Sequence, residues 1–234
     1  MARHQVRALL MGGQACVFYG AAEFSRDADL AILLESENLQ RLETALKELQ
    51  ARRIAIPPFE ADYLARGHAV HFRCFHPEVE RLRVDVMARM RGVEAFPALW
   101  ERRTTLEDGE GGTYELLSLP DLVRAKKTQR SKDWPMLQRL LEAHYFRHHR
   151  QPTETQIRFW LRELRTPELL IEAVKRWPEP TAKLREERPL LEHAVAGNSP
   201  ALETALWEEE RAEKEADRRY WAPLKAELER LRHA

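Results

Sequence analysis

The sequence predicts an α/β N-terminal domain, with a small mixed sheet and flanking helices, followed by an all-α C-terminal region. In the N-terminal part, short runs alternate between apolar and polar residues, which is typical of strands, and longer runs carry apolar residues at helical spacing. Beyond residue 118 the strand pattern almost disappears, and prolines separate successive helical stretches. We therefore expect two domains, residues 1–117 and residues 118–234.

The N-terminal elements are expected in the order β-α-β-α-β-β. A Gly12-Gly13 turn separates the first strand from the first helix, and Pro57-Pro58 stops the second helix. The alternation of strands and helices indicates an α/β unit. Strands are expected over residues 6–11, 27–34, 69–75 and 82–87, and helices over residues 14–22 and 37–53.

The transition to the C-terminal region is predicted from turn and cap residues. The glycine-rich segment Asp108 to Gly112 is expected to form a turn, and Ser118 is expected to cap a helix that starts with Pro120. The segment from Ala201 to Arg232 is highly charged and nearly continuous in helix formers. We therefore expect helices, and almost no strands, throughout the second domain.

Composition narrows the classes of function. The 38 basic side chains balance the 38 acidic ones, so no global field draws the protein onto nucleic acid or membrane, and any such binding requires a local patch. Cys16 and Cys74 do not form a zinc-binding or disulfide pattern, which favours a reducing compartment. No stretch approaches the ~18 apolar residues of a membrane span. The expectation is a soluble cytoplasmic protein with no membrane partner.

Three aspartates are the candidate metal ligands. Asp27 and Asp29 are two residues apart on a predicted strand, so their carboxylates point to the same face of the sheet. Asp85 is the acidic residue of the strand over 82–87, where the alternation places it opposite the apolar face. Mg²⁺ prefers hard oxygen ligands, and protein carboxylates usually supply part of its shell. Three carboxylates on one sheet face would therefore suit Mg²⁺ chemistry on a phosphorylated substrate.

The glycine pair is a candidate phosphate contact. Gly12 and Gly13 follow a strand and open a helix, where glycine lets backbone N–H groups approach a phosphate. A tight turn without a ligand, or surface carboxylates on a strand, would explain either feature alone. The combination of the glycine turn and three strand-borne aspartates within one domain favours a site.

These residues, in this order and spacing, resemble the DNA polymerase β-like nucleotidyltransferase superfamily, in particular the minimal and abortive-infection toxin-type transferases of bacteria. Many members also carry Arg-x-Thr just before the first aspartate. Here Ser25 stands at the threonine position, and Glu23 stands at the arginine position. The resemblance covers residues 5–135, and it implies a nucleotidyltransferase-like fold for the N-terminal domain.

The resemblance also implies roles for these residues. Asp27 and Asp29 would hold two Mg²⁺ ions, for which Mn²⁺ would substitute, and Asp85 would ligate the ion that activates the acceptor hydroxyl. Gly12, Gly13 and Ser25 would contact the NTP. Lys126, Lys127 and Arg130 are expected on one helix and would steady the triphosphate or the leaving pyrophosphate. That segment is locally basic, because residues 121–150 contain eight Lys and Arg against three Asp and Glu. A solvated helix face is the alternative.

The expected function is therefore Mg²⁺-dependent transfer of an NMP from an NTP to a hydroxyl acceptor, which would be a protein, an RNA or a small molecule. The resemblance also raises a role as the toxin of a toxin–antitoxin pair, with an antitoxin protein as partner. One alternative is a catalytically degenerate member that binds nucleotide or a partner protein, and Glu23 favours it. Another is an RNA-binding module that uses the basic helix, against which the balanced net charge argues.

Overall fold

The computed structural model describes residues 1–109 and 111–233. By its internal contacts the chain divides into two compact units. The first contains residues 1–18 and 22–125 together with the C-terminal residues from 219, and the second contains residues 19–21 and 126–218. The expected division at residues 117 and 118 differs from this one, because helix α5 (Leu119–Ala125) and the end of the last helix belong to the first unit.

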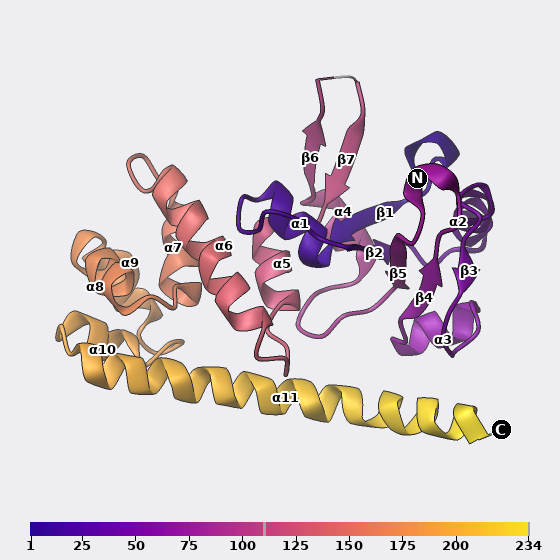
Figure 1. Cartoon of the computed structure of the whole chain (residues 1–234). Coiled ribbons are helices and arrows are strands. Elements are labelled where there is room, and N and C mark those ends of the chain that lie inside the picture. The colour runs from indigo at the N-terminus through magenta and orange to yellow at the C-terminus, as the bar shows by residue number, and fades with distance from the viewer. Residues whose placement is uncertain (110, 234) are drawn as a thin grey trace. The chain divides into compact units, whose positions relative to one another are not determined.

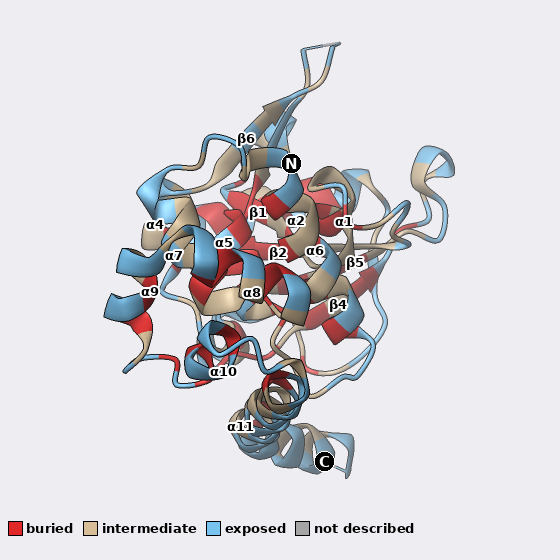
Figure 2. Ribbon diagram, turned by 90° about the vertical axis from the view of Figure 1, so that its left-hand side faces the viewer, coloured by how far each residue is buried: buried red, intermediate tan, exposed pale blue. Residues whose placement is uncertain are grey.

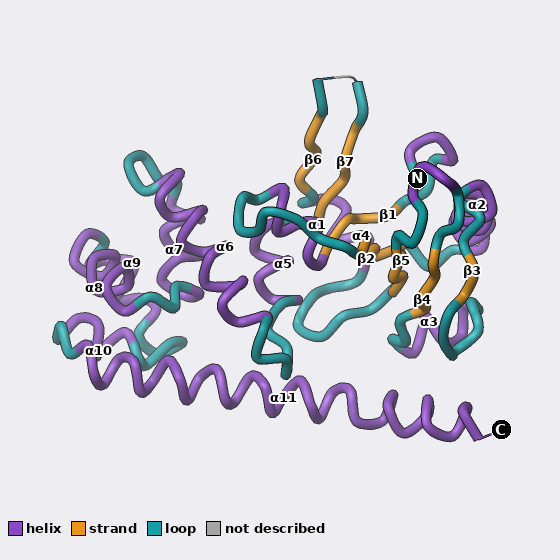
Figure 3. The backbone as a smooth tube through the Cα atoms, in the orientation of Figure 1, coloured by secondary structure: helices purple, strands orange, loops and turns teal. Residues whose placement is uncertain are grey.

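A mixed seven-stranded sheet forms the framework of the first unit (Figure 1, Figure 3). The pairs β2–β5 and β1–β7 are parallel, whereas β1–β2, β4–β5, β3–β4 and β6–β7 are antiparallel. The strand order is β3-β4-β5-β2-β1-β7-β6. The strands are β1 (Ala8–Met11), β2 (Asp27–Ile32), β3 (Arg52–Arg53), β4 (Val70–Arg73), β5 (Arg83–Met87), β6 (Thr104–Glu107) and β7 (Thr113–Leu116).

One face of this sheet is the apolar core of the first unit. Alternate residues of β2, β4 and β5 point into it and pack with Leu42 and Leu46 of α2 (Ser36–Glu48) and Leu64 of α3 (Ala61–Arg66). Figure 2 shows buried residues, in red, on strands of the sheet and on helices such as α5. The opposite face receives the alternate residues of the same strands, which are polar except for Ala31 and Met87. The remaining helices of this unit are η1 (Ala2–His4), α1 (Gly12–Phe18), η2 (Pro77–Val79) and α4 (Phe96–Glu101).

The second unit is helical, as the proline-punctuated sequence predicts. Pro167 and Pro178 occupy first-turn positions, where their missing N–H costs nothing, and Thr153 forms a capping box with Gln156. Tyr145 and Trp160 are fully buried, with ring centroids 5.0 Å apart. The helices are α6 (Asp133–His148), α7 (Glu154–Glu163), α8 (Pro167–Arg176), α9 (Pro178–Leu184), α10 (Leu191–Val195) and α11 (Ser199–His233), which continues into the first unit.

Two helix ends fall earlier than the sequence predicts. The first helix stops at Phe18 rather than residue 22, and Gly20 in the following turn has a left-handed φ of 79°. The second stops at Glu48 rather than residue 53, where Gln50 has a φ of 51°. A left-handed residue cannot continue a right-handed helix, so the chain turns at both points. The second turn leaves room for the two-residue edge strand β3, which was not predicted.

The β6–β7 hairpin also was not predicted, and it projects from the rest of the first unit (Figure 1). The expected turn over residues 108–112 lies at its tip: the Asp108 amide donates to the Gly112 carbonyl at 2.9 Å, while Glu110 lies outside the described residues.

Among the residues the structure describes, no helix is long and apolar enough to span a lipid bilayer.

Candidate functional site

Strand register brings the three aspartates onto the polar face of the sheet. Asp29 of β2 is the direct partner of Asp85 of β5, and Asp27 is the partner of Arg83. Direct partners on adjacent strands project to the same face, and so do residues two apart on one strand. Asp27, Asp29 and Asp85 therefore share one face, as the alternation predicted.

The glycine turn packs directly against this face. Gly12 has a φ of 63°, and a Cβ there would lie 1.8 Å from Oδ2 of Asp29. A Cβ on Gly13 would lie 2.7 Å from Oγ of Ser25, which in turn donates to the Asp27 carbonyl at 3.0 Å. Gly12 is therefore required both by close approach and by its backbone conformation, whereas a side chain at position 13 would have to displace the Ser25 hydroxyl. The turn that the sequence marked as a phosphate contact is thus adjacent to Asp29 and Ser25.

Two basic residues hold the third carboxylate. Nε of Arg83 donates to Oδ1 of Asp85 at 2.7 Å, and Nδ1 of His71 lies 2.8 Å from the same oxygen. Arg83 and Asp85 are two residues apart on β5, and His71 is the direct partner of Asp85 on β4. The three side chains therefore meet on the polar face of the sheet. Arg83 also lies in the lateral position next to Asp27.

These contacts set the charge of Asp85. Burial by itself would raise the pKa of Asp85, but the hydrogen bonds from His71 and Arg83 outweigh it and hold that pKa below its ordinary value. The hydrogen bond between Arg83 and Asp85, aided by the charges of Asp27 and Asp29, raises the pKa of Arg83. Asp85 is thus an anion at neutral pH, which suits a cation ligand better than a proton acceptor.

The donor chemistry of this face fits a divalent cation, because three carboxylates lie on it. Within the described part of the chain, however, no three His, Cys, Asp or Glu side chains are placed together so as to hold a metal ion. The Asp85 carboxylate is bonded to Arg83 and His71, which agrees with the absence of such a group among the described residues. Binding of an ion by all three aspartates would therefore require their side chains to turn toward one another.

The prediction that Lys126, Lys127 and Arg130 lie on a helix is wrong. They belong to the second unit and lie in the loop between α5 and α6. Asp133 organises this loop, because it accepts from Oγ1 of Thr128 at 2.6 Å and from Nε of Arg130 at 2.8 Å. The Gln129 amide donates to Oδ2 of Asp217 at 2.8 Å, and the Arg130 amide donates to Oγ1 of Thr128 at 3.2 Å, so side-chain acceptors replace helical hydrogen bonds in this loop.

The two lysines also have carboxylate partners inside the second unit. Nζ of Lys126 is buried and lies 3.4 Å from Oδ1 of Asp133. Nζ of Lys127 lies 2.7 Å from Glu163 and 3.7 Å from Glu213. These contacts give both lysines a structural role, and their predicted contact with a triphosphate stays a prediction.

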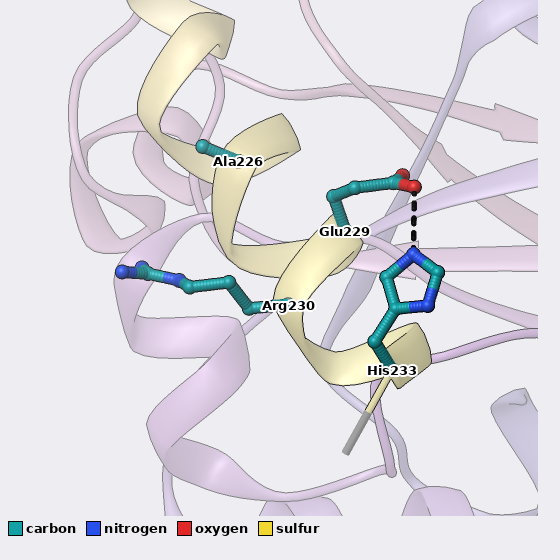
Figure 4. A pocket seen from close by; sticks show the side chains of 4 residues that line it. All are labelled: Ala226, Glu229, Arg230 and His233. Carbon is teal, nitrogen blue, oxygen red and sulfur yellow. Dashed lines mark hydrogen bonds and ion pairs between the residues drawn. The ribbon is translucent and has the colours of Figure 1, made fainter.

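A surface hollow on the C-terminal end of α11 involves none of the predicted site residues. Its lining is Ala226, Glu229, Arg230 and His233 (Figure 4). Nε2 of His233 lies 3.3 Å from Glu229, so two of the polar groups in it are paired with each other. The hollow therefore shares no residue with the aspartate face.

His71 and Arg83 are the site residues that were not predicted. The alternation of β5 already places Arg83 on the face of Asp85, and that signal was available from the sequence. The position of His71 depends on the register between β4 and β5, which sequence spacing does not fix.

No known protein-family model matches this chain, and no curated protein is similar enough to count as a match. The assignment of a function therefore rests on the residues and geometry described above.

Substitution of Gly12 tests the packing of the glycine turn on Asp29. Gly12→Ala is expected to lower the free energy of unfolding by about 2–5 kcal/mol, the sum of about 1–2 for a left-handed alanine and about 1–3 for overpacking. In an Asp29→Gly background only the backbone part should remain. Chemical denaturation of the four proteins of this cycle gives the coupling between the two positions.

Gly197→Ala is the matched control, because Gly197 has a φ of 66° but nothing within 4 Å of its added Cβ. It should show the backbone cost alone. An equal effect of Gly12→Ala with and without the Asp29 side chain would show that the two residues are not packed as described.

A second prediction concerns the pKa of Asp85. Because Arg83 helps to hold this pKa low, Arg83→Gln should raise it, measured by NMR titration of the carboxyl carbon. The lowered folded-state pKa means that ionised Asp85 stabilises the fold above the unfolded pKa of about 3.9, and that this stability is lost as the pH falls through the folded pKa. The acid loss of stability in that window should therefore be smaller in Arg83→Gln.

Arg53→Gln is the control: Arg53 lies on the edge strand β3 and pairs with Phe72, on the other face of the sheet from Asp85, so the titration should be unchanged. An Asp85 pKa that is the same in the wild type and in Arg83→Gln would contradict the described contact.

Proposed function

We propose that this protein is a Mg²⁺-dependent nucleotidyltransferase of the polymerase β-like type, which moves an NMP from an NTP to a hydroxyl acceptor. The observation that carries the proposal is the lateral register of Asp29 with Asp85, with Asp27 on the same face and Gly12 against Asp29. A mixed sheet with helices is compatible with that fold family.

The reaction has simple requirements. The acceptor oxygen forms a bond to the α-phosphorus, the bond between that phosphorus and the α–β bridging oxygen breaks, and pyrophosphate leaves. Asp27, Asp29 and Asp85 would hold Mg²⁺, which when bound neutralises phosphate charge and activates the hydroxyl. The hydroxyl proton passes to solvent water, because a carboxylate with a lowered pKa, such as Asp85, is a poor proton acceptor.

The residues around the aspartates have separate tasks in this proposal. Gly12 and Gly13, which have no side chains, let the triphosphate approach the backbone beside Asp29. Ser25, fixed by its bond to the Asp27 carbonyl, borders the same turn. Arg83, with its pKa raised, stays protonated and holds Asp85 ionised before the substrate binds. The acceptor remains a protein, an RNA or a small molecule, and a toxin role with an antitoxin partner belongs to the same proposal.

A nucleotide-binding module without transfer activity is the second candidate. The observation that favours it is the engagement of Asp85 by both Arg83 and His71, which competes with a role as metal ligand. Such a protein would keep the glycine turn and bind NTP through Gly12 and Gly13, but it would not release pyrophosphate.

The test is transfer of label from each common NTP, radiolabelled at the α-phosphate, to the components of a cell extract in the presence of Mg²⁺. Asp27→Asn and Asp29→Asn should each lower transfer at least about a hundredfold, comparable to the loss of one group that stabilises the transition state. An amide is a poor Mg²⁺ ligand, while its size leaves the fold intact.

Asp62→Asn, an exposed residue in the first turn of α3, is the matched control and should transfer at the wild-type rate. Label on the γ-phosphate should not be incorporated, because it leaves with pyrophosphate. Wild-type protein that binds NTP but never transfers label would favour the binding module. Full activity of both aspartate variants would reject this face as the site.

A further inference from the structure

A row of arginines runs across the polar face of the sheet and ends at the proposed site. Arg52 of β3 is the direct partner of Arg73 of β4, Arg73 is the partner of Arg83 of β5, and Arg83 is the partner of Asp27. Lateral partners project to the same face, so these four side chains form one line. The line runs from the edge strand inward, and from Arg52 to Arg83 it crosses two interstrand spacings, on the order of 10 Å.

The outer part of this row is open to solvent. Arg52 and Arg73 are exposed, and 37% of the Arg83 side chain is accessible. In the described part of the chain neither Arg52 nor Arg73 forms an ion pair with a carboxylate, unlike Arg83 with Asp85. The row thus concentrates positive charge on a chain with no net charge.

An exposed aromatic ring accompanies the arginines. Phe75 follows β4 and is 44% exposed, and the guanidinium of Arg52 lies over its ring at 5.2 Å from the centroid. A positively charged strip with an aromatic face is the combination that binds single-stranded nucleic acid, because arginines contact phosphates and rings stack on bases. An acidic protein segment would use the arginines but would have no bases for Phe75.

We propose that the arginine row, Arg52–Arg73–Arg83, together with Phe75, binds the phosphate backbone of a single-stranded polynucleotide. The planar guanidinium groups of Arg52 and Arg73 bind phosphate oxygens with two parallel hydrogen bonds each. Arg83, whose Nε is bonded to Asp85, adds its positive charge and its remaining N–H groups at the inner end of the row. The chemistry is shared by RNA and DNA, and the 2′-hydroxyl decides between them.

The direction of the arginine row also indicates that the end of a bound strand would reach the proposed site. Because it leads from the sheet edge to Asp27, a strand bound along it would present its end to the aspartate face. The acceptor class would then be the terminal hydroxyl of a polynucleotide, a conclusion that rests on the proposed function. Binding along the row itself does not depend on transfer.

The test is fluorescence anisotropy of the full-length protein with a labelled single-stranded oligouridylate, without NTP and with EDTA. The wild type should bind, and Arg52→Gln/Arg73→Gln should bind at least about tenfold more weakly, since two phosphate contacts are lost. The slope of log K against log salt should become shallower by about 1.4, or about 0.7 for each lost contact. Phe75→Leu, which keeps apolar volume but removes the ring face, should weaken binding about fivefold or more, within the range for loss of one stacked base.

Arg53→Gln is the matched control, because Arg53 lies on the same strand with the same charge but pairs with Phe72, on the core side of the sheet. It should bind within about twofold of the wild type. A deoxyoligonucleotide arm separates RNA from DNA binding. Polyglutamate that competes as well as the oligonucleotide, together with a silent Phe75→Leu, would overturn the proposal in favour of an acidic protein partner.

The outcomes for the two proposals are separable. Asp27→Asn should keep oligonucleotide binding while it loses transfer. Binding that is absent in the wild type, or equal in the wild type and the double arginine variant, overturns the arginine row and leaves the transferase proposal standing. Binding along the row in a protein that never transfers label rejects the transferase proposal alone.

Discussion

The parallel pairing of β2 with β5 is the constraint on which the candidate site depends. Each strand contributes apolar residues to one face and polar residues to the other, and a shift of register by one residue would move every side chain to the opposite face. Burial of Leu30 and Ile32 against α2 fixes the register of β2, and burial of Val84 and Val86 fixes that of β5. The position of Asp29 beside Asp85 is therefore a consequence of core packing.

The same constraint explains how the other features of the polar face arise. Register places His71 beside Asp85 and Arg73 beside Arg83, so one row is acidic at its centre and the next row is basic toward the sheet edge. Gly12 is then required where β1 ends, because the Asp29 carboxylate fills the space that a side chain would need. The acidic and basic side chains on this face thus occupy separate rows because side chains alternate between the two faces of each strand. The apolar core on the other face holds these strands in register.

Much of this arrangement could be predicted from local pattern, and the failures have physical causes. The strands that form the core either alternate, as β4 and β5 do, or are apolar on successive residues, as β1 and the end of β2 are. All four therefore lie close to their predicted positions, and the face of the three aspartates follows from the two-residue period of a strand. The hairpin strands β6 and β7 are half-exposed and rich in threonine and glutamate, so they lack that signal. The residues around Lys126 and Arg130 favour a helix and so predict one, whereas in the structure the amides of Gln129 and Arg130 donate to the side chains of Asp217 and Thr128. The contact of His71 with Asp85 needed a register that only tertiary packing provides.

The central claim is that the aspartate face binds a divalent cation together with a nucleotide. Electron paramagnetic resonance of Mn²⁺, titrated into the protein with a non-hydrolysable NTP, measures this directly and without any acceptor. We expect the protein to bind Mn²⁺ in the presence of the nucleotide, with a resonance signal broadened by carboxylate and phosphate coordination. This binding should be lost when Asp27 and Asp29 are both replaced by asparagine. Mn²⁺ binding that is the same in the wild type and in that double variant would contradict the account.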